Sequence, residues 1–260
     1  MKLKLQYLII AFFSCLALRA QETFQPKQMN TSAGIVYNQE FAVGLRLHTH
    51  GFAAGVTLGK LSTYYLTKYL HFELGELKHE KEFRQSFDSP SALGGRISRA
   101  FKYGKQNNLF VLRGAMGAKR YFSEKAKHKG VAFGISYEGG ATLGLLKPYY
   151  LELRGYDGRV SETTKYSKEN EERFLDIYSI QGSSGWTKGI GELSILPGAH
   201  AKVAVHFDWG AYDEYLKSIE AGIMADFFIR KAPIMVEIDG VENQRLFLNL
   251  FLHFQFGKRW

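Results

Sequence analysis

The feature that most constrains the fold of this chain is a long, strict alternation of side chains near its C-terminal end. In residues 246–257 every second position is Leu or Phe: Leu246, Leu248, Leu250, Leu252, Phe254 and Phe256. Because side chains point alternately to the two faces of a β-strand, this segment predicts a strand with one unbroken apolar face. Its length matches the ~9–11 residues with which a tilted strand crosses a membrane, whereas strands of globular proteins usually have ~5–6.

The same alternation recurs along the rest of the chain. Long alternating segments are 131–145, 199–209 and 218–229, shorter ones are 41–48, 52–59, 69–75 and 149–156, and looser ones are 31–38, 94–104 and 108–121. With the C-terminal segment these are eleven, whereas bacterial single-chain barrels have even strand numbers. We therefore predict an all-β fold, a transmembrane antiparallel β-barrel of about 10 strands (range 8–12). In the ten-stranded version 31–49 is one bent strand, and a short strand at 234–238 would give twelve.

A soluble β-sandwich is the alternative, because its strands also alternate between an apolar and a polar face. Strand length favours the membrane barrel, and so do the aromatic residues that gather near the segment ends, among them Tyr121, Tyr149, Trp209, Tyr215 and Trp260. Such aromatic girdles lie at the lipid–water boundary. The content of 15% aromatic residues suits strands. The mean hydropathy of -0.20 is too low for a bundle of membrane helices.

The formal net charge of +9 raises the question of nucleic-acid binding. Its positive charges are scattered over turns and strands, without the basic cluster and interleaved aromatic residues of a nucleic-acid-binding surface. The sequence therefore predicts no nucleic-acid partner. A basic surface that faces anionic outer-membrane lipid or periplasmic proteins fits the charge better.

The N-terminus predicts export. A short cationic head is followed by an apolar run at 5–18 and by Ala20, which is the pattern of a signal peptide over residues 1–20. The run is too short to span a bilayer, which needs ~20 residues. Cys15 suggests a lipoprotein signal, but the bulky Phe12 and Phe13 before it fit that signal badly. We expect a periplasmic N-terminal segment at 21–30, a barrel over 31–260, and localisation in the outer membrane of a Gram-negative bacterium.

The inward face of the predicted strands collects charges of both signs. This predicted lumen charge network consists of Arg46, Glu73, Arg113, Glu138, Glu152, Arg154, Lys202, Asp208, Glu220 and Asp226. In a narrow barrel such charges should pair across the lumen and leave little free bore. Histidines share this face, but His200 and His206 are separated by ~20 Å along a strand and cannot bind one ion. We expect hydrogen-bonded histidines, with no metal site and no cofactor.

If this chain were an enzyme like the known barrel acyl hydrolases, it would need a Ser activated by a His. The known barrel phospholipases and lipid deacylases carry a His two residues from the Ser on one strand face. None of the 8 histidines of this chain has a Ser at that spacing, and no Gly-x-Ser-x-Gly motif is present. The glycine-rich segment 139–144 has no following Lys, which argues against phosphate binding. The sequence therefore predicts no catalytic residues.

The long loop 158–196 predicts the main interaction of the protein. After a polar stretch it carries an apolar set: Phe174, Ile177, Tyr178, Trp186, Ile190 and Leu193. Exposed apolar side chains in such number mark either a partner surface or a lid packed over the barrel mouth. We expect this loop and 78–91 to lie outside the cell, and the short turns 104–108 and 145–149 to be periplasmic.

Several segments are similar to a family of uncharacterised outer-membrane β-barrel proteins of Bacteroidota. The resemblance rests on 76–82, 103–113, 144–150, 197–202 and 207–212, and extends over most of 40–230. Where the family reads Lys-His-Pro-Lys-Glu, this chain has Glu80 in place of the proline, so that turn differs. The resemblance implies a barrel and, as an expectation, a subunit of that phylum's enlarged barrel-assembly or secretion machinery.

From these observations we expect a non-catalytic accessory or scaffold subunit that contacts outer-membrane lipid and other outer-membrane or periplasmic proteins. A small pore for solutes or ions is the alternative, and an outer-membrane lipid-modifying enzyme is a distant third. The filled lumen argues against the pore, because paired charges occupy the bore of so narrow a barrel.

Overall fold

The computed structural model describes residues 37–63, 65–85, 99–123, 130–155, 161–210 and 214–260. The predicted signal peptide 1–20, Cys15 and the predicted periplasmic segment 21–30 lie outside these residues. None of the described helices is both long enough and apolar enough to cross a membrane.

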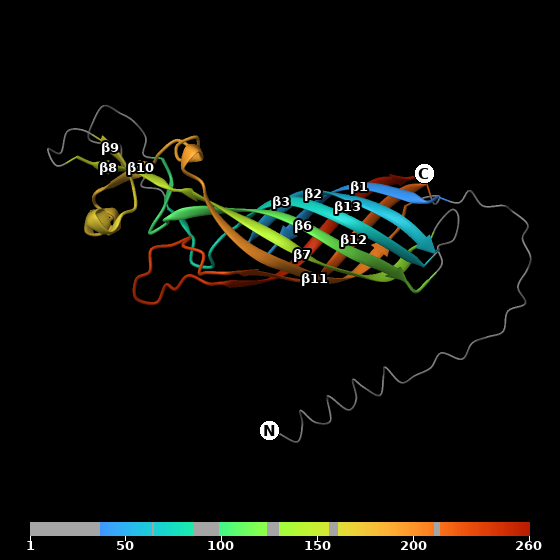
Figure 1. The fold of residues 1–260 in the computed structure, drawn as a ribbon. Coiled ribbons are helices and arrows are strands. Elements are labelled where there is room, and N and C mark those ends of the chain that lie inside the picture. The colour runs from blue at the N-terminus through green and yellow to red at the C-terminus, as the bar shows by residue number, and fades with distance from the viewer. Residues whose placement is uncertain (1–36, 64, 86–98, 124–129, 156–160, 211–213) are drawn as a thin grey trace, which may run out of the picture. The chain divides into compact units, whose positions relative to one another are not determined.

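Eight antiparallel strands form a closed barrel, which Figure 1 shows as a ribbon. They are β1 Gln39–His48, β2 Gly51–Thr63, β3 Leu66–Leu77, β6 Asn107–Tyr121, β7 Ala132–Pro148, β11 Ser194–Asp208, β12 Tyr215–Phe228 and β13 Leu246–Arg259. Each strand pairs with its neighbour in the barrel order β1-β13-β12-β11-β7-β6-β3-β2. The barrel closes because β1 pairs with both β13 and β2, with Glu40 opposite Arg259 on one side and Gly59 on the other.

The barrel has eight strands, and the prediction of about ten was wrong because three of the eleven segments do not join it. Segment 149–156 forms β8 (Tyr150–Arg154), which pairs with β9 (Ser161–Lys165) and β10 (Ile180–Ser183) in a separate sheet. Within the described part of 94–104 the strand is only β5 (Phe101–Lys102), paired with β4 (Arg84–Gln85). The first barrel strand begins at Gln39, and 31–36 lies outside the described residues. Segment 234–238 contributes single bridges at Met235 and Ile238.

The two ends of the barrel differ. At the terminal end β1 begins and β13 ends. At the opposite end, here the capped end, lie the described residues of 49–50, 78–106, 149–193 and 229–245. The predicted periplasmic turns 104–108 and 145–149 are both at the capped end, since Asn107 pairs with Pro148. Placing them opposite the long segments was therefore wrong. The strands β6 and β7 have 15 and 17 residues and run further than the alternation alone indicated.

The connection between β7 and β11 is a small folded unit. The cap, defined as the described residues of 149–193, contains β8, β9 and β10, the 3-10 turns η1 (Lys168–Asn170) and η2 (Ile190–Glu192), and the helix α2 (Glu171–Leu175). Its apolar core consists of Leu151, Leu153, Phe174 and Ile180, with Phe101 and Val236 from neighbouring connections. The last residues of the predicted loop 158–196 belong to β11.

Candidate functional site

The interior of the barrel is lined by buried polar side chains. They come from alternate positions of all eight strands, while the intervening positions are exposed and mainly apolar. Eight of the ten residues predicted for the lumen charge network lie inside: Arg46, Glu73, Arg113, Glu138, Lys202, Asp208, Glu220 and Asp226. Glu152 and Arg154 do not, and their assignment to the lumen was wrong because β8 belongs to the cap sheet.

Two arginines form the centre of the lumen network. The Arg46 Nε lies 3.2 Å from a Glu73 carboxylate oxygen, and its Nη2 lies 3.3 Å from Glu138. Arg113 donates through Nε and Nη2 to the two oxygens of Asp226, at 2.9 and 2.8 Å, and also contacts Glu73. The side chains of both arginines are at most 1% exposed. Burial of so many charges is tolerated because each cation meets more than one carboxylate.

A lysine and two histidines extend the network toward the terminal end. The Lys202 ammonium bridges Glu138 at 3.0 Å and Glu220 at 2.9 Å. Glu220 also contacts ring nitrogens of His206 at 3.0 Å and His253 at 3.4 Å. Lys202 and His206 of β11 and His253 of β13 thus converge on Glu220 of β12, and Lys202 links them to Glu138 of β7. These contacts fix the four strands relative to one another.

The terminal end of the lumen is closed by a second set of ion pairs. Arg259 donates to Glu40 at 2.9 Å and to Asp208 at 3.0 Å, and Lys119 donates to Glu40 at 3.0 Å. The hydroxyl of Tyr121 accepts a further hydrogen bond from Arg259. Glu40 and Arg259 were not among the residues predicted to face the lumen, although both follow the same inward alternation.

The capped end of the lumen is closed by apolar side chains. Inward residues of the strands, including Leu77, Leu109 and Phe228, pack against Ala232, Ile234 and Met235. The last three belong to the connection 229–245 between β12 and β13. This connection, here called the stopper, therefore closes the barrel mouth. A lid over the mouth was one of the two roles expected of the loop 158–196.

Gly140 lets β7 lie close to the neighbouring strand β6. A Cβ placed on Gly140 would lie 2.1 Å from the carbonyl oxygen of Gly114 and 2.5 Å from the Cα of Ala115. Any larger residue at Gly140 would push the strands apart.

The outer surface of the cap exposes apolar and aromatic side chains. Of the predicted partner-loop residues, Tyr178 is 90% exposed, Trp186 69%, and Ile177, Ile190 and Leu193 are each more than a third exposed. Phe174 is fully buried in the cap core, so its assignment to the contact surface was wrong. An apolar residue on a short amphipathic helix can lie on either side, and the sequence pattern did not distinguish them.

Trp186 also joins the cap to the barrel wall. Its ring makes an edge contact with Phe110 on β6, and the Lys147 ammonium of β7 lies 4.4 Å from the ring centroid. Lys147 also donates a hydrogen bond to the Trp186 carbonyl. The segment around Trp186 is therefore held against the outer face of the β6–β7 pair.

A buried ionic group lies beside the cap. The Lys105 ammonium lies 2.6 Å from a Glu82 carboxylate oxygen, and Lys102 binds the same oxygen. Burial, and to a smaller extent the neighbouring Lys102 ammonium, lowers the pKa of Lys105 to about 8, although the Glu82 carboxylate opposes this shift. Burial opposes ionisation of Glu82, yet the neighbouring Lys105 and Lys102 ammonium groups bring the pKa of that carboxyl below its usual value.

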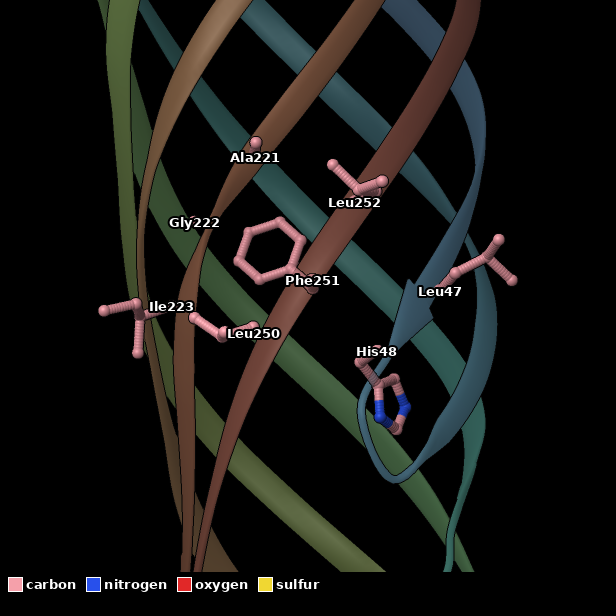
Figure 2. A pocket seen from close by; sticks show the side chains of 8 residues that line it. All are labelled: Leu47, His48, Ala221, Gly222, Ile223, Leu250, Phe251 and Leu252. Carbon is pink, nitrogen blue, oxygen red and sulfur yellow. The ribbon is translucent and has the colours of Figure 1, made fainter.

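Figure 2 shows an open recess in the barrel wall. It is lined by Leu47 and His48 of β1, Ala221, Gly222 and Ile223 of β12, and Leu250, Phe251 and Leu252 of β13. The lining is mostly apolar. The two ring nitrogens of His48 have no hydrogen-bond partner in the described part of the chain. With neither a nucleophile nor a carboxylate among its lining residues, the recess offers no catalytic pair.

Unlike His48, the lumen histidines His200, His71 and His206 form hydrogen bonds. His200 contacts Asp226 at 2.9 Å, and His71 contacts Thr57 at 2.9 Å through ring nitrogens. Over the ranges that the structure describes, no group of three or more His, Cys, Asp or Glu side chains is arranged to hold a metal ion.

Together these features define a closed eight-stranded antiparallel barrel with an apolar outer wall, a filled and charged interior and a folded cap. Among solved structures of similar fold is the crystal structure of Neisserial surface protein A (NspA), with a TM-score of 0.36 and 9% identity over 86% of this chain and 96% of that chain. The N-terminal β-barrel domain of Pseudomonas aeruginosa OprF has a TM-score of 0.35 and 10% identity over 85% of this chain and 98% of that chain. No family model and no curated protein matches the sequence.

Proposed function

We propose that this chain is an outer-membrane β-barrel of a Gram-negative bacterium that transports no solute and serves as a non-catalytic accessory or scaffold subunit of envelope machinery. In this proposal the barrel anchors the cap in the membrane, and the cap binds a partner protein. The machinery would be one for barrel assembly or protein secretion, which is the expectation that the resemblance to the Bacteroidota family provides.

Membrane embedding is supported by the outer wall of the barrel. Outward positions of every strand carry large apolar side chains, with Leu250 62% exposed and Val203 60% exposed. Leaving so much apolar surface in water is unfavourable, whereas a bilayer accommodates it. Trp209, Tyr215 and Trp260 lie at the terminal end, where a girdle would meet the lipid–water boundary.

The orientation follows from the connections at the two ends. In bacterial outer-membrane barrels the periplasmic turns are short and the extracellular loops are longer. The longest connections between barrel strands, 78–106 and 149–193, both begin and end at the capped end. We therefore place the cap outside the cell and the terminal end in the periplasm.

The observation that carries the proposal is the closure of the lumen. Arg46 and Arg113 cross it with buried ion pairs, and the stopper around Ile234 fills the mouth at the capped end. A pore would need these groups to be separated, which would leave buried charges without partners. Purified protein in planar bilayers should accordingly show no steady current. Stable channels in the nanosiemens range would contradict the proposal and favour the pore.

The partner surface can be tested by substitution of exposed cap residues. Deleting 161–190 would remove the core residues Phe174 and Ile180 and unfold the cap, so the double variant Tyr178→Ala/Ile190→Ala, which spares the Trp186 contact with the barrel wall, is preferable. After affinity purification from native membranes and mass spectrometry, this variant should lose co-purifying envelope proteins while its barrel keeps its heat-modifiable migration. The matched control is Met116→Ala, which alters an equally exposed residue on the barrel wall. Equal partner recovery from the cap variant and the control would place the contact elsewhere and contradict the proposed role of the cap.

A further inference from the structure

Three cations stand together on the outer wall at the terminal end of the barrel. They are Lys60 on β2, Lys68 on β3 and Arg120 on β6, three strands that lie side by side (Figure 1). All three are exposed and point outward. On each strand the next outward position toward the middle of the barrel is apolar: Leu58, Leu70 and Ala118. Each cation is thus the first charged group beyond the apolar band.

The strand register makes these cations neighbours. Lys60 is directly opposite Lys68, and Lys68 is opposite Ala118, two residues from Arg120. Directly opposite residues have Cβ atoms ~4.5–5.5 Å apart, and diagonal neighbours ~7–8 Å apart. Like charges directly opposite one another are destabilising. The barrel therefore holds a concentrated positive charge here at a cost to its own stability.

No acidic side chain in the described part of the chain forms an ion pair with Lys60, Lys68 or Arg120. Glu40 is at the same level of β1, opposite Gly59, but it points inward, where Lys119 and Arg259 occupy it. The opposite side of the barrel is different. There Lys258 lies 3.0 Å from Glu214, so its charge is balanced within the protein.

We propose that Lys60, Lys68 and Arg120 bind the phosphate of an anionic glycerophospholipid in the membrane leaflet at the terminal end. Cations at this level meet the headgroups of the lipid, while its acyl chains lie along the apolar positions that begin with Leu58 and Leu70. Three cations exceed the charge of one phosphodiester, so a lipid with two phosphates binds more tightly than a lipid with one. The inference rests on the proposed membrane embedding, but not on the cap or its partner.

The test compares lipid selectivity in reconstituted barrels. Spin-labelled phosphatidylcholine, phosphatidylglycerol and cardiolipin are added in turn, and the motionally restricted fraction gives the relative association of each lipid. Cardiolipin should associate most strongly and phosphatidylcholine least. Lys68→Gln should lower the cardiolipin preference roughly fivefold, the effect expected of one basic residue at an anionic membrane surface. The triple variant Lys60→Gln/Lys68→Gln/Arg120→Gln should abolish it.

The control variant is Lys217→Gln/Lys258→Gln, which removes charge at the same end on β12 and β13. It should keep the preference; an equal loss would show a general charge effect and overturn the site. Equal association of all three lipids with the unaltered barrel would overturn it too. Heat-modifiable migration in phosphatidylcholine vesicles reports insertion separately. Failure to insert would reject the membrane proposal, whereas insertion without selectivity would reject the lipid site alone. Displacement of cardiolipin by millimolar inorganic phosphate would indicate a site for the free anion and overturn the lipid assignment.

Discussion

The barrel and the cap bury opposite kinds of side chain. The barrel buries charges such as Arg46 and Glu138 and exposes Leu and Phe, whereas the cap buries Phe174 and Leu153 and exposes charges such as Arg154. Each arrangement suits one solvent, because apolar surface is tolerated in lipid and charged surface in water. A single chain therefore changes from burying charged side chains to burying apolar ones within a few residues, here between β7 and β8.

The largest expected effect comes from breaking the polar core of the barrel. Arg113→Met leaves the carboxylates of Glu73 and Asp226 without their common partner, which should cost ~3–5 kcal/mol of unfolding free energy. Urea unfolding in vesicles measures this loss. Arg154→Met, in the exposed part of the cap, should change the same quantity by less than ~0.5 kcal/mol. Similar losses in both variants would mean that the two regions do not follow different rules.

The apolar core of the cap should be comparably sensitive, but only locally. Phe174→Ala removes a fully buried ring and should cost the cap ~3–5 kcal/mol. We expect rapid proteolysis within 149–193 and an unchanged heat-modifiable barrel. Tyr178→Ala, on the exposed side of the same cap, serves as the control and should leave proteolysis unchanged. Loss of the folded barrel in the Phe174 variant would show that the two regions are one cooperative unit.

The outer wall should tolerate charge poorly. Leu250→Arg places a guanidinium on the outward face of β13 and should cost ~2–4 kcal/mol of stability in the membrane, depending on depth. The neighbouring position Asn249 is not a suitable control for this substitution, because its side chain is buried in the lumen and accepts hydrogen bonds from Thr49 and the backbone of His50. Ile177→Arg on the cap is the matched comparison and should be nearly neutral. Efficient insertion of the Leu250 variant into vesicles would contradict the assignment of this wall to lipid.

The smallest expected effect is a pH dependence of the cap region. The folded pKa of Lys105 is about 8, below its ordinary value of 10.5, because the ammonium is buried. The folded state therefore binds fewer protons than the unfolded state between these values, and its stability rises with pH across this window. Proteolysis within 78–106 should be slower at about pH 9.5 than at about pH 7.5. Lys105→Met should remove most of this difference, and an unchanged pH profile in that variant would exclude Lys105 as its source.

Alternation alone predicted much of the barrel. The facing of β13 and the inward placement of Arg46, Lys202 and Asp226 follow directly from the period of two, because one register error would invert every side chain. Glu40 and Arg259 carry the same signal and were missed only because they lie at strand ends. Sequence periodicity therefore indicates faces reliably where strands are long.

The same alternation does not indicate which sheet a strand belongs to. The segment 149–156 alternates like a barrel strand because Leu151 and Leu153 face an apolar core, but that core belongs to the cap. In β8 the apolar residues face a protein core and the charged residues face away from it, the reverse of a barrel strand. For this reason Glu152 and Arg154 were wrongly assigned to the lumen. The stopper residues Ala232, Ile234 and Met235 lie in a connection without a regular period, so their long-range contacts have no local signature.

The position of the stopper along the chain links closure of the lumen with closure of the barrel wall. The connection 229–245 joins β12 to β13, and β13 forms the closing pair with β1. The hairpin of β12 and β13 therefore also carries the residues that close the mouth of the barrel. Closure of the barrel wall and closure of its mouth thus depend on the same β12–β13 hairpin, so a change that displaces this hairpin should open both.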